Sequence, residues 1–370
     1  MADTNDKTGA VEIHGMITAY QKSQILLTAC ELGVFEALVG DGHVKKTAEQ
    51  LATELSTVVD ATERLLNGCV SLKLLDKSWD SDEEAFFSNT QAASKYLIEG
   101  SKTSLKGVIL YNARTAYGMM ANLVHAVREG KEQHYRMSGV TGSQLYDNFF
   151  SNEASTIEFL GVMHGLSIMT GGVTAKAFDL SAFKTVCEFG GGSGALAYEM
   201  SRTYPEMSIK VLELPPVVKA SKHFEPDDVR QLNVEFVAGD FFVDELPKAD
   251  LYIFSRIFHN WKEDKINQLL QKAHSALTPG GAVLIAEILY SDDKTGSSYV
   301  VPQVLVHVTR CRRQGTVGKR VQPPVREEWF LRRKGQGHRR IIWRSFGKTV
   351  LTRTCRCLRL DYHSESTESS

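Results

Sequence analysis

The sequence lacks several features that mark particular classes of protein. No apolar run approaches the ~18 residues that a membrane-spanning helix needs, and residues 1–9 are polar and acidic, so we expect neither a membrane partner nor a signal peptide. Only three cysteines occur among residues 1–300, at spacings that fit no paired metal site: Cys30, Cys69 and Cys187. Each lies in an apolar run, which predicts reduced, buried thiols in a cytoplasmic protein without a structural metal.

The chain also has no large net charge, since its net charge is −1. Basic and acidic residues are nevertheless unevenly distributed along it. Residues 301–370 contain 16 Lys and Arg against 5 acids, whereas the rest of the chain contains 27 against 39. The acidic body argues against nucleic acid as a partner, because phosphate-binding surfaces are basic.

Residues 11–100 predict a mainly α-helical, winged-helix-like domain. Apolar residues recur at helical spacing over 11–38. Thr47 and Gln50 fit a capping box at the start of a second helix, and a third is expected over 60–75. An Asp-rich loop and an apolar patch complete the pattern of a winged helix.

A winged helix suggests DNA binding, but the charges of this domain do not. Residues 41–99 hold eleven acids against six Lys and Arg, and the expected recognition helix offers only Arg64 and Lys73. A DNA-binding face would be basic. We therefore predict that this domain mediates dimerisation.

Residues 101–180 predict a helical linker and substrate-pocket segment. Helical periodicity extends over 104–129 and again over 145–170, with several Met and aromatic side chains in each. Such side chains can line a flat apolar pocket, but at helical spacing they more often belong to a core. This alternative stays open.

Residues 181–296 predict an α/β domain with an open, mostly parallel, Rossmann-like sheet. Five short apolar runs alternate with helical spacers, and each ends at glycine or a polar residue; they lie at 186–189, 209–213, 234–238, 249–256 and 281–287. Parallel strands bring their carboxyl ends to one edge, where such folds bind ligands. The ligand crevice is expected there.

The glycine-rich turn after the first of these strands is weak evidence by itself. Glycines allow positive φ and let a ligand lie against the backbone, a feature that nicotinamide dehydrogenases share. Their fingerprint has a third glycine three residues after the second, where this chain has Ala197 after Gly194. A cofactor site is therefore expected, with a dehydrogenase as the rival interpretation.

Several motifs in the right order make a more specific signal than the turn. From about residue 15 to about 293, the chain resembles the S-adenosylmethionine-dependent O-methyltransferases of small hydroxylated molecules. The residues that carry the resemblance are 188–194, Glu213, 239–242, Arg256 with 259–261, and 279–281. The resemblance implies S-adenosylmethionine as cofactor, a small hydroxyindole or phenol as substrate, and a homodimer.

The resemblance also implies which residues hold the cofactor. Gly190 and Gly192 would pass close to its methionyl and ribose parts, and Glu213 would accept the ribose hydroxyls. The other expected contacts are Phe150, Gly239, Asp240 at the adenine amino group, Phe241 on the ring, and Arg256 on nearby polar groups.

The same resemblance implies that His259 is the general base. A neutral imidazole accepts a proton near neutral pH, and this one follows the fourth strand beside the crevice. Glu287, at the end of the fifth strand, matches an acid that orients the histidine; a solvated carboxylate is an equal alternative.

Three positions depart from the family pattern. Phe150 and Ser167 stand where relatives carry Tyr and Trp against the methyl donor, and Asn260 stands where they carry Asp. Asn hydrogen-bonds but cannot stabilise an imidazolium by charge. A second hypothesis follows, namely a catalytically impaired homologue that serves as a dimerisation or regulatory subunit.

The resemblance stops at about residue 296. Residues 297–370 form a divergent basic tail, with thirteen arginines between 301 and 360 and no sustained periodicity. We expect it to be disordered, as an out-of-frame or alternatively spliced segment or as a basic extension that binds acidic surfaces or RNA. The sheet would then end at a bare fifth strand.

Overall fold

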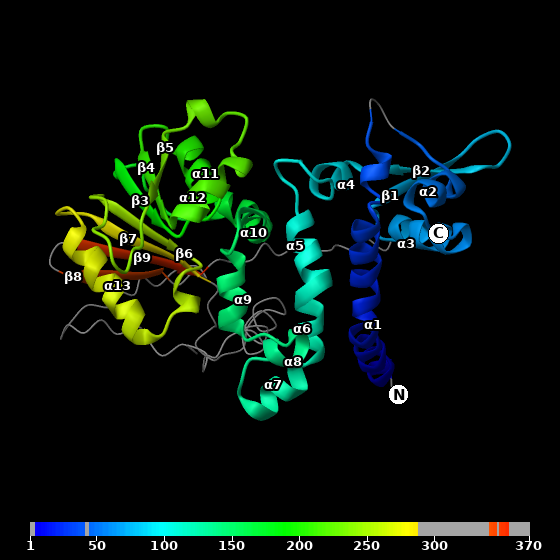
Figure 1. The fold of residues 1–370 in the computed structure, drawn as a ribbon, viewed down its shortest axis with the longest axis horizontal. Helices are drawn as coiled ribbons and strands as arrows, with labels where there is room; N and C mark the ends of the chain where they lie inside the picture. The colour runs from blue at the N-terminus through cyan, green and yellow to red at the C-terminus, as the bar shows by residue number, and fades with distance from the viewer. Residues whose placement is uncertain (1–3, 41–43, 288–339, 346–347, 355–370) are drawn as a thin grey trace.

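The structure is a computed structural model, in which a helical N-terminal part and an α/β part lie at opposite ends of the molecule with helices between them (Figure 1). It describes residues 4–40, 44–287, 340–345 and 348–354. Within these residues, no helix combines the length and the apolar character needed to cross a membrane. Cys30, Cys69 and Cys187 are free and buried, as predicted.

The N-terminal part has the predicted winged-helix arrangement. Its elements are α1 (Thr4–Leu32), a 3₁₀ turn η1 (Glu36–Leu38), α2 (Ala48–Leu55), α3 (Val59–Ser71), β1 (Leu75–Trp79), β2 (Ala85–Asn89) and α4 (Gln91–Tyr96). Thr47 and Gln50 form the predicted capping box of α2. The helix expected over 60–75 ends at Ser71, because Leu75 pairs with Asn89 in the antiparallel β1–β2 wing.

The two long helices expected in the linker are both interrupted. Residues 104–129 divide into α5 (Lys106–Tyr111), a π-helical turn η2 (Asn112–Ala116), α6 (Tyr117–Ala121) and α7 (Leu123–Glu129). The side chain of Asn122 donates to the carbonyl of Gly118, which competes with regular helix bonding at the break.

The second interruption lies between α9 (Gly142–Phe149) and α10 (Glu153–Ala175), after the short α8 (His134–Ser138). Asn152 ends the gap because its side chain accepts from the N–H of Ser155 and so caps α10.

The five predicted strands form a continuous parallel part of a mostly parallel sheet, whose order is β5-β4-β3-β6-β7-β9-β8. They are β3 (Thr185–Phe189), β4 (Ser208–Glu213), β5 (Val234–Ala238), β6 (Leu251–Ser255) and β7 (Ala282–Glu287). Between them lie α11 (Ala195–Thr203), α12 (Pro215–Ser221), the 3₁₀ turns η3 (Lys222–Phe224), η4 (Val229–Gln231) and η5 (Phe258–Asn260), and α13 (Glu263–Ala276). The predicted α/β, Rossmann-like fold class is confirmed.

Alternate residues of the central strands enter two separate apolar cores. Cys187 and Phe189 of β3 pack with α13 residues such as Leu269, whereas Val186 packs with Leu196 of α11. The alternation follows from the period of two along a strand. It buries both faces of β3 and leaves only its carboxyl end open to a ligand.

The C-terminal edge of the sheet differs from the expectation of a bare strand. Two strands from the basic tail, β8 (Arg340–Ser345) and β9 (Lys348–Thr354), extend the sheet; β9 pairs parallel to β7 and antiparallel to β8. An unpaired edge offers N–H and C=O groups to any extended segment, and both segments contain β-branched residues. The high arginine content of the tail concealed its tendency to form these strands. The other residues of 297–370 lie outside the described residues, and so does the disorder that we expected there.

Candidate functional site

The glycine-rich turn after β3 adopts the backbone that only glycine tolerates well. Gly190 and Gly192 have φ of 60° and 61°. A Cβ at Gly190 would lie 2.6 Å from Cδ1 of Ile257 and 3.7 Å from the ring of Phe241. The ends of β3, β5 and β6 therefore meet at this glycine, at the position where the strand order reverses.

Glu213 closes the turn from the end of β4. Its carboxylate accepts from the N–H of Gly192 at 2.9 Å and from the N–H of Leu214 at 3.0 Å. Burial raises the pKa of Glu213 to about 6, although these two hydrogen bonds oppose the rise. The carboxylate is thus fixed against the glycine turn.

Glu188 lies under the same turn and was not predicted as a site residue. Its Oε2 is buried and has no hydrogen-bond partner among the described residues. A Cβ at Gly191 would lie 2.8 Å from this oxygen. Burial, followed by the charge of Glu213, raises the pKa of Glu188 to about 7. An acid two residues before the first glycine of the turn was the available signal.

The segment after β5 brings a third acid and an aromatic ring to the crevice. Asp240 accepts from the N–H of Phe242 at 2.8 Å, while its own N–H donates to Asp244 at 2.7 Å. Gly239 begins this turn, and its N–H donates to the carbonyl of Glu213. The ring of Phe241 packs edge-on against Phe189.

Phe150 approaches the crevice from the side of α10. Its ring contacts Phe159 at a centroid distance of 5.7 Å and packs in a cluster with Leu160 and Leu214. Leu160 lies 3.6 Å from where a Cβ at Gly192 would be. Phe150 therefore belongs to an apolar cluster that reaches the glycine turn through Leu160.

His259 and Glu287 form a pair, although 28 residues separate them. Nδ1 of His259 lies 2.9 Å from Oε2 of Glu287. Oε1 of the same carboxylate accepts from the N–H of Phe258 at 2.8 Å. Glu287 is buried, whereas the His259 side chain is 31% exposed. The solvated alternative for Glu287 is wrong, because its oxygens orient the histidine and its turn.

Arg256 lies between this pair and α10. Its guanidinium donates to the carbonyl of Met163 and to the hydroxyl of Ser167. Asn260 directs its side-chain amide to the carbonyl of Arg256 at 3.5 Å. Ser167 and Asn260, two of the three departures from the family pattern, are thus in contact with Arg256.

His164 is another residue that the sequence analysis missed. Its Nδ1 lies 2.9 Å from the hydroxyl of Ser193 in the glycine turn, and its Nε2 lies 3.3 Å from the carbonyl of Lys102. Burial lowers the pKa of His164, which favours the neutral ring. It joins α10, the glycine turn and the linker before α5.

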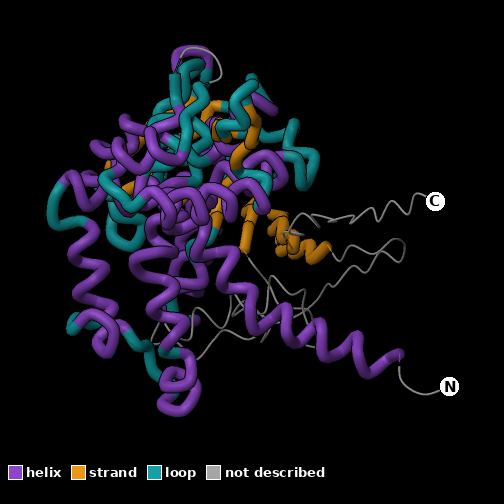
Figure 2. Tube along the Cα trace, turned by 90° about the vertical axis from the view of Figure 1, so that its right-hand side faces the viewer, coloured by secondary structure: helices purple, strands orange, loops and turns teal. Residues whose placement is uncertain are grey.

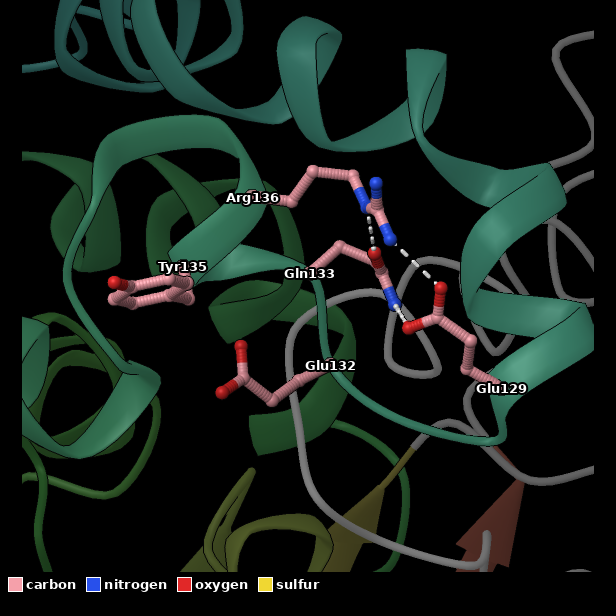
Figure 3. Close-up of a pocket in the computed structure, with 5 residues that line it drawn as sticks. All are labelled: Glu129, Glu132, Gln133, Tyr135 and Arg136. Carbon is pink, nitrogen blue, oxygen red and sulfur yellow. Dashed lines mark hydrogen bonds and ion pairs between the residues drawn. The ribbon is translucent and has the colours of Figure 1, made fainter.

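A polar pocket of about 450 Å³ lies elsewhere, around α7 and α8 (Figure 3). Its lining residues are Glu129, Glu132, Gln133, Tyr135 and Arg136. Arg136 donates to Glu129 and Gln133, and Gln133 donates to Glu129, so these groups satisfy one another. None of the predicted site residues lines it.

Comparison with known proteins gives two family matches. A model of the O-methyltransferase domain matches residues 120–316, and a model of the O-methyltransferase dimerisation domain matches residues 15–99. Both agree with the order of domains described above. Neither supports the dehydrogenase alternative.

Individual relatives point the same way. Bovine acetylserotonin O-methyltransferase is 38% identical over 75% of this chain and 79% of its own length. A human "Probable bifunctional dTTP/UTP pyrophosphatase/methyltransferase protein" is 36% identical over 78% of this chain, which spans only 46% of that relative. The crystal structure of human N-acetylserotonin methyltransferase in complex with S-adenosylmethionine superposes with a TM-score of 0.74 and 33% identity, over 84% of this chain and 88% of that one.

Proposed function

The chain belongs to the S-adenosylmethionine-dependent O-methyltransferase family, and from this premise we propose that it methylates the hydroxyl of a small hydroxyindole or phenol with His259 as general base. N-acetylserotonin, which would give melatonin, is the first acceptor to test, because the relatives include acetylserotonin O-methyltransferases. The observation that carries the proposal is the His259–Glu287 pair, whose histidine lies two residues after Ile257, the residue that packs at Gly190.

The crevice residues suit this donor. When bound, S-adenosylmethionine supplies a methyl group activated by a sulfonium. Gly190 and Gly192 offer backbone without side chains, and Glu213 offers carboxylate oxygens to a diol. Phe241 and Asp240 would take the adenine ring and its amino group, while Phe150 would cover the donor with an apolar surface.

The contact between His259 and Glu287 supports the role of His259 as a base. If Nδ1–H donates to Glu287, the lone pair of the neutral ring is on Nε2. Nε2 can then accept the proton of an acceptor hydroxyl, and Glu287 stabilises the resulting imidazolium. The charge that Asn260 cannot supply is thus available from Glu287, which weakens the case for a catalytically impaired homologue.

Dimerisation is the second part of the proposal. Figure 2 shows α1 extending away from the other helices. Five of its apolar side chains are at least half exposed: Val11, Ile13, Met16, Ile17 and Tyr20. The last four recur at three- and four-residue spacing and share one face, whereas Val11 lies on the opposite side of the helix. A contiguous exposed apolar face is typical of an interaction surface. We propose that it meets a second copy of this chain.

Two measurements test the activity separately. Titration calorimetry of the full chain with S-adenosylmethionine should give saturable binding; no binding at millimolar donor would refute the proposed cofactor site. Mass spectrometry should then detect methylated product with N-acetylserotonin. Binding without methylation of any hydroxyindole or phenol would refute the proposed acceptor class.

A further inference from the structure

Arg256 connects three elements of the site through different atoms. Its backbone has a φ of 54°, in the left-handed region that non-glycine residues seldom adopt. Its N–H donates to the carbonyl of Ala286 in β7 at 2.9 Å. Its Nη2 donates to the carbonyl of Met163 at 3.3 Å and to the hydroxyl of Ser167, both in α10.

These contacts continue directly into the catalytic pair. Ala286 precedes Glu287, whose carboxylate binds His259 and the N–H of Phe258. The carbonyl of Arg256 accepts from Asn260, the residue after His259. A displacement of Arg256 would therefore move the end of β6, the end of β7 and the η5 turn together.

The hydroxyl of Ser167, on α10, accepts from this guanidinium. The Met163 carbonyl lies one helical turn earlier, so the two acceptors are on the same face of α10. A hydroxyl there can accept a charge-assisted hydrogen bond, and alanine cannot.

We propose that Ser167 is a positioning residue, which holds the Arg256 guanidinium against α10 and thereby fixes the His259–Glu287 pair. This inference rests on the proposed function only where turnover is measured. The contacts of Ser167 with Arg256 and of His259 with Glu287 form within the chain, so they can be tested without donor or acceptor. It also assigns a role to a position at which the chain departs from its family's pattern.

The test compares Ser167→Ala with Ser167→Thr, which restores the hydroxyl. Thr170→Ala is the matched control, because this substitution removes an exposed hydrogen bond from the Thr170 hydroxyl to the carbonyl of Leu166 on the same helix. In the donor-free protein, ¹⁵N chemical shifts of the His259 imidazole report its tautomer and its bond to Glu287. They should move in Ser167→Ala and return toward wild type in Ser167→Thr, with Thr170→Ala unchanged.

Turnover gives the second readout. Ser167→Ala should lower kcat by roughly 10- to 100-fold, the order expected when a reacting group is misplaced, with a smaller change in KM. Unchanged imidazole shifts in Ser167→Ala, or equal effects of Ser167→Ala and Ser167→Thr, would overturn the inference. If wild type fails to bind S-adenosylmethionine, the proposed function fails, while the imidazole shifts still decide the role of Ser167.

Discussion

Nδ1 of His259 lies 2.9 Å from Oε2 of Glu287, and the other oxygen of Glu287 accepts from the backbone that leads into the histidine. One buried carboxylate thus orients both the imidazole and its turn. In the proposed reaction it would also balance the positive charge that develops on the ring.

The first prediction concerns His259. His259→Ala should reduce methyl transfer by roughly 10²- to 10⁴-fold, the range for loss of a general base. Donor affinity should change little, since the proposed contact is with the acceptor. Product formation and titration calorimetry measure the two effects; a variant that keeps most of its turnover removes the base assignment.

The second prediction concerns Glu213. Glu213→Ala should weaken S-adenosylmethionine binding by roughly 1.5–3 kcal/mol, the usual value of hydrogen bonds to a charged group. Because the pKa of Glu213 is raised to about 6, the ionised acceptor is present above that pH. Wild-type affinity should therefore be higher at pH 8 than at pH 5.

Two comparisons make this prediction specific. Glu213→Gln keeps the shape but not the titration, so its affinity should depend less on pH than that of wild type. Glu235→Gln, on the neighbouring strand β5 with an exposed side chain, is the control for loss of one carboxylate. Equal donor affinity in Glu213→Ala and wild type means that the ribose contact is elsewhere.

The third prediction concerns Glu188 and stability. Its folded-state pKa of about 7 lies above the ordinary 4.5, so the folded protein retains a proton that the unfolded chain releases. Protonated Glu188 therefore makes its full contribution to the free energy of unfolding below about pH 4.5. This contribution is lost as the pH rises through 7. Glu188→Gln removes the buried charge.

The stabilisation of Glu188→Gln relative to wild type should consequently grow between pH 5 and pH 8. Its upper limit is about 3 kcal/mol, the value of the full pKa difference. Denaturant unfolding of both proteins at each pH measures it, and the comparison cancels the other titrating groups. A difference that is constant with pH, or that shrinks as pH rises, contradicts the prediction.

The fourth prediction concerns the exposed face of α1. Ile13 and Ile17 lie four residues apart on this face and are 60% and 65% exposed. Replacing both by Glu should weaken the proposed homodimer by at least 10-fold. Each substitution removes an aliphatic side chain whose burial in the dimer would contribute ~1.5–3 kcal/mol, and each adds a charge. Sedimentation equilibrium measures the dissociation constant.

Glu12→Gln is the control on the same helix, since Glu12 is exposed and its replacement preserves the apolar face. A wild-type chain that remains monomeric at micromolar concentration, or a double variant that dimerises as tightly as wild type, would show that this face has another role.

Local patterns in the sequence predicted the strands and the capping box because short-range chemistry decides them. An apolar run ending in Gly190 cannot continue as a buried strand, and Thr47 with Gln50 satisfies a helix start by itself. The same patterns placed the site at the strand ends. They failed over 104–129, where a side chain interrupts a helix whose apolar spacing continues.

The sequence alone thus determined the order of the elements, the glycine turn and the identity of the polar residues at the edge of the sheet. Only the tertiary structure decided which of them meet. His259 and Glu287 are 28 residues apart, and Arg256 and Ser167 are 89 apart. The burial that raises the pKa of Glu188, and the pairing of β9 with β7, likewise depend on neighbours distant along the chain. Hydrogen bonds and desolvation act over a few ångströms, and only the folded chain brings distant residues within that range.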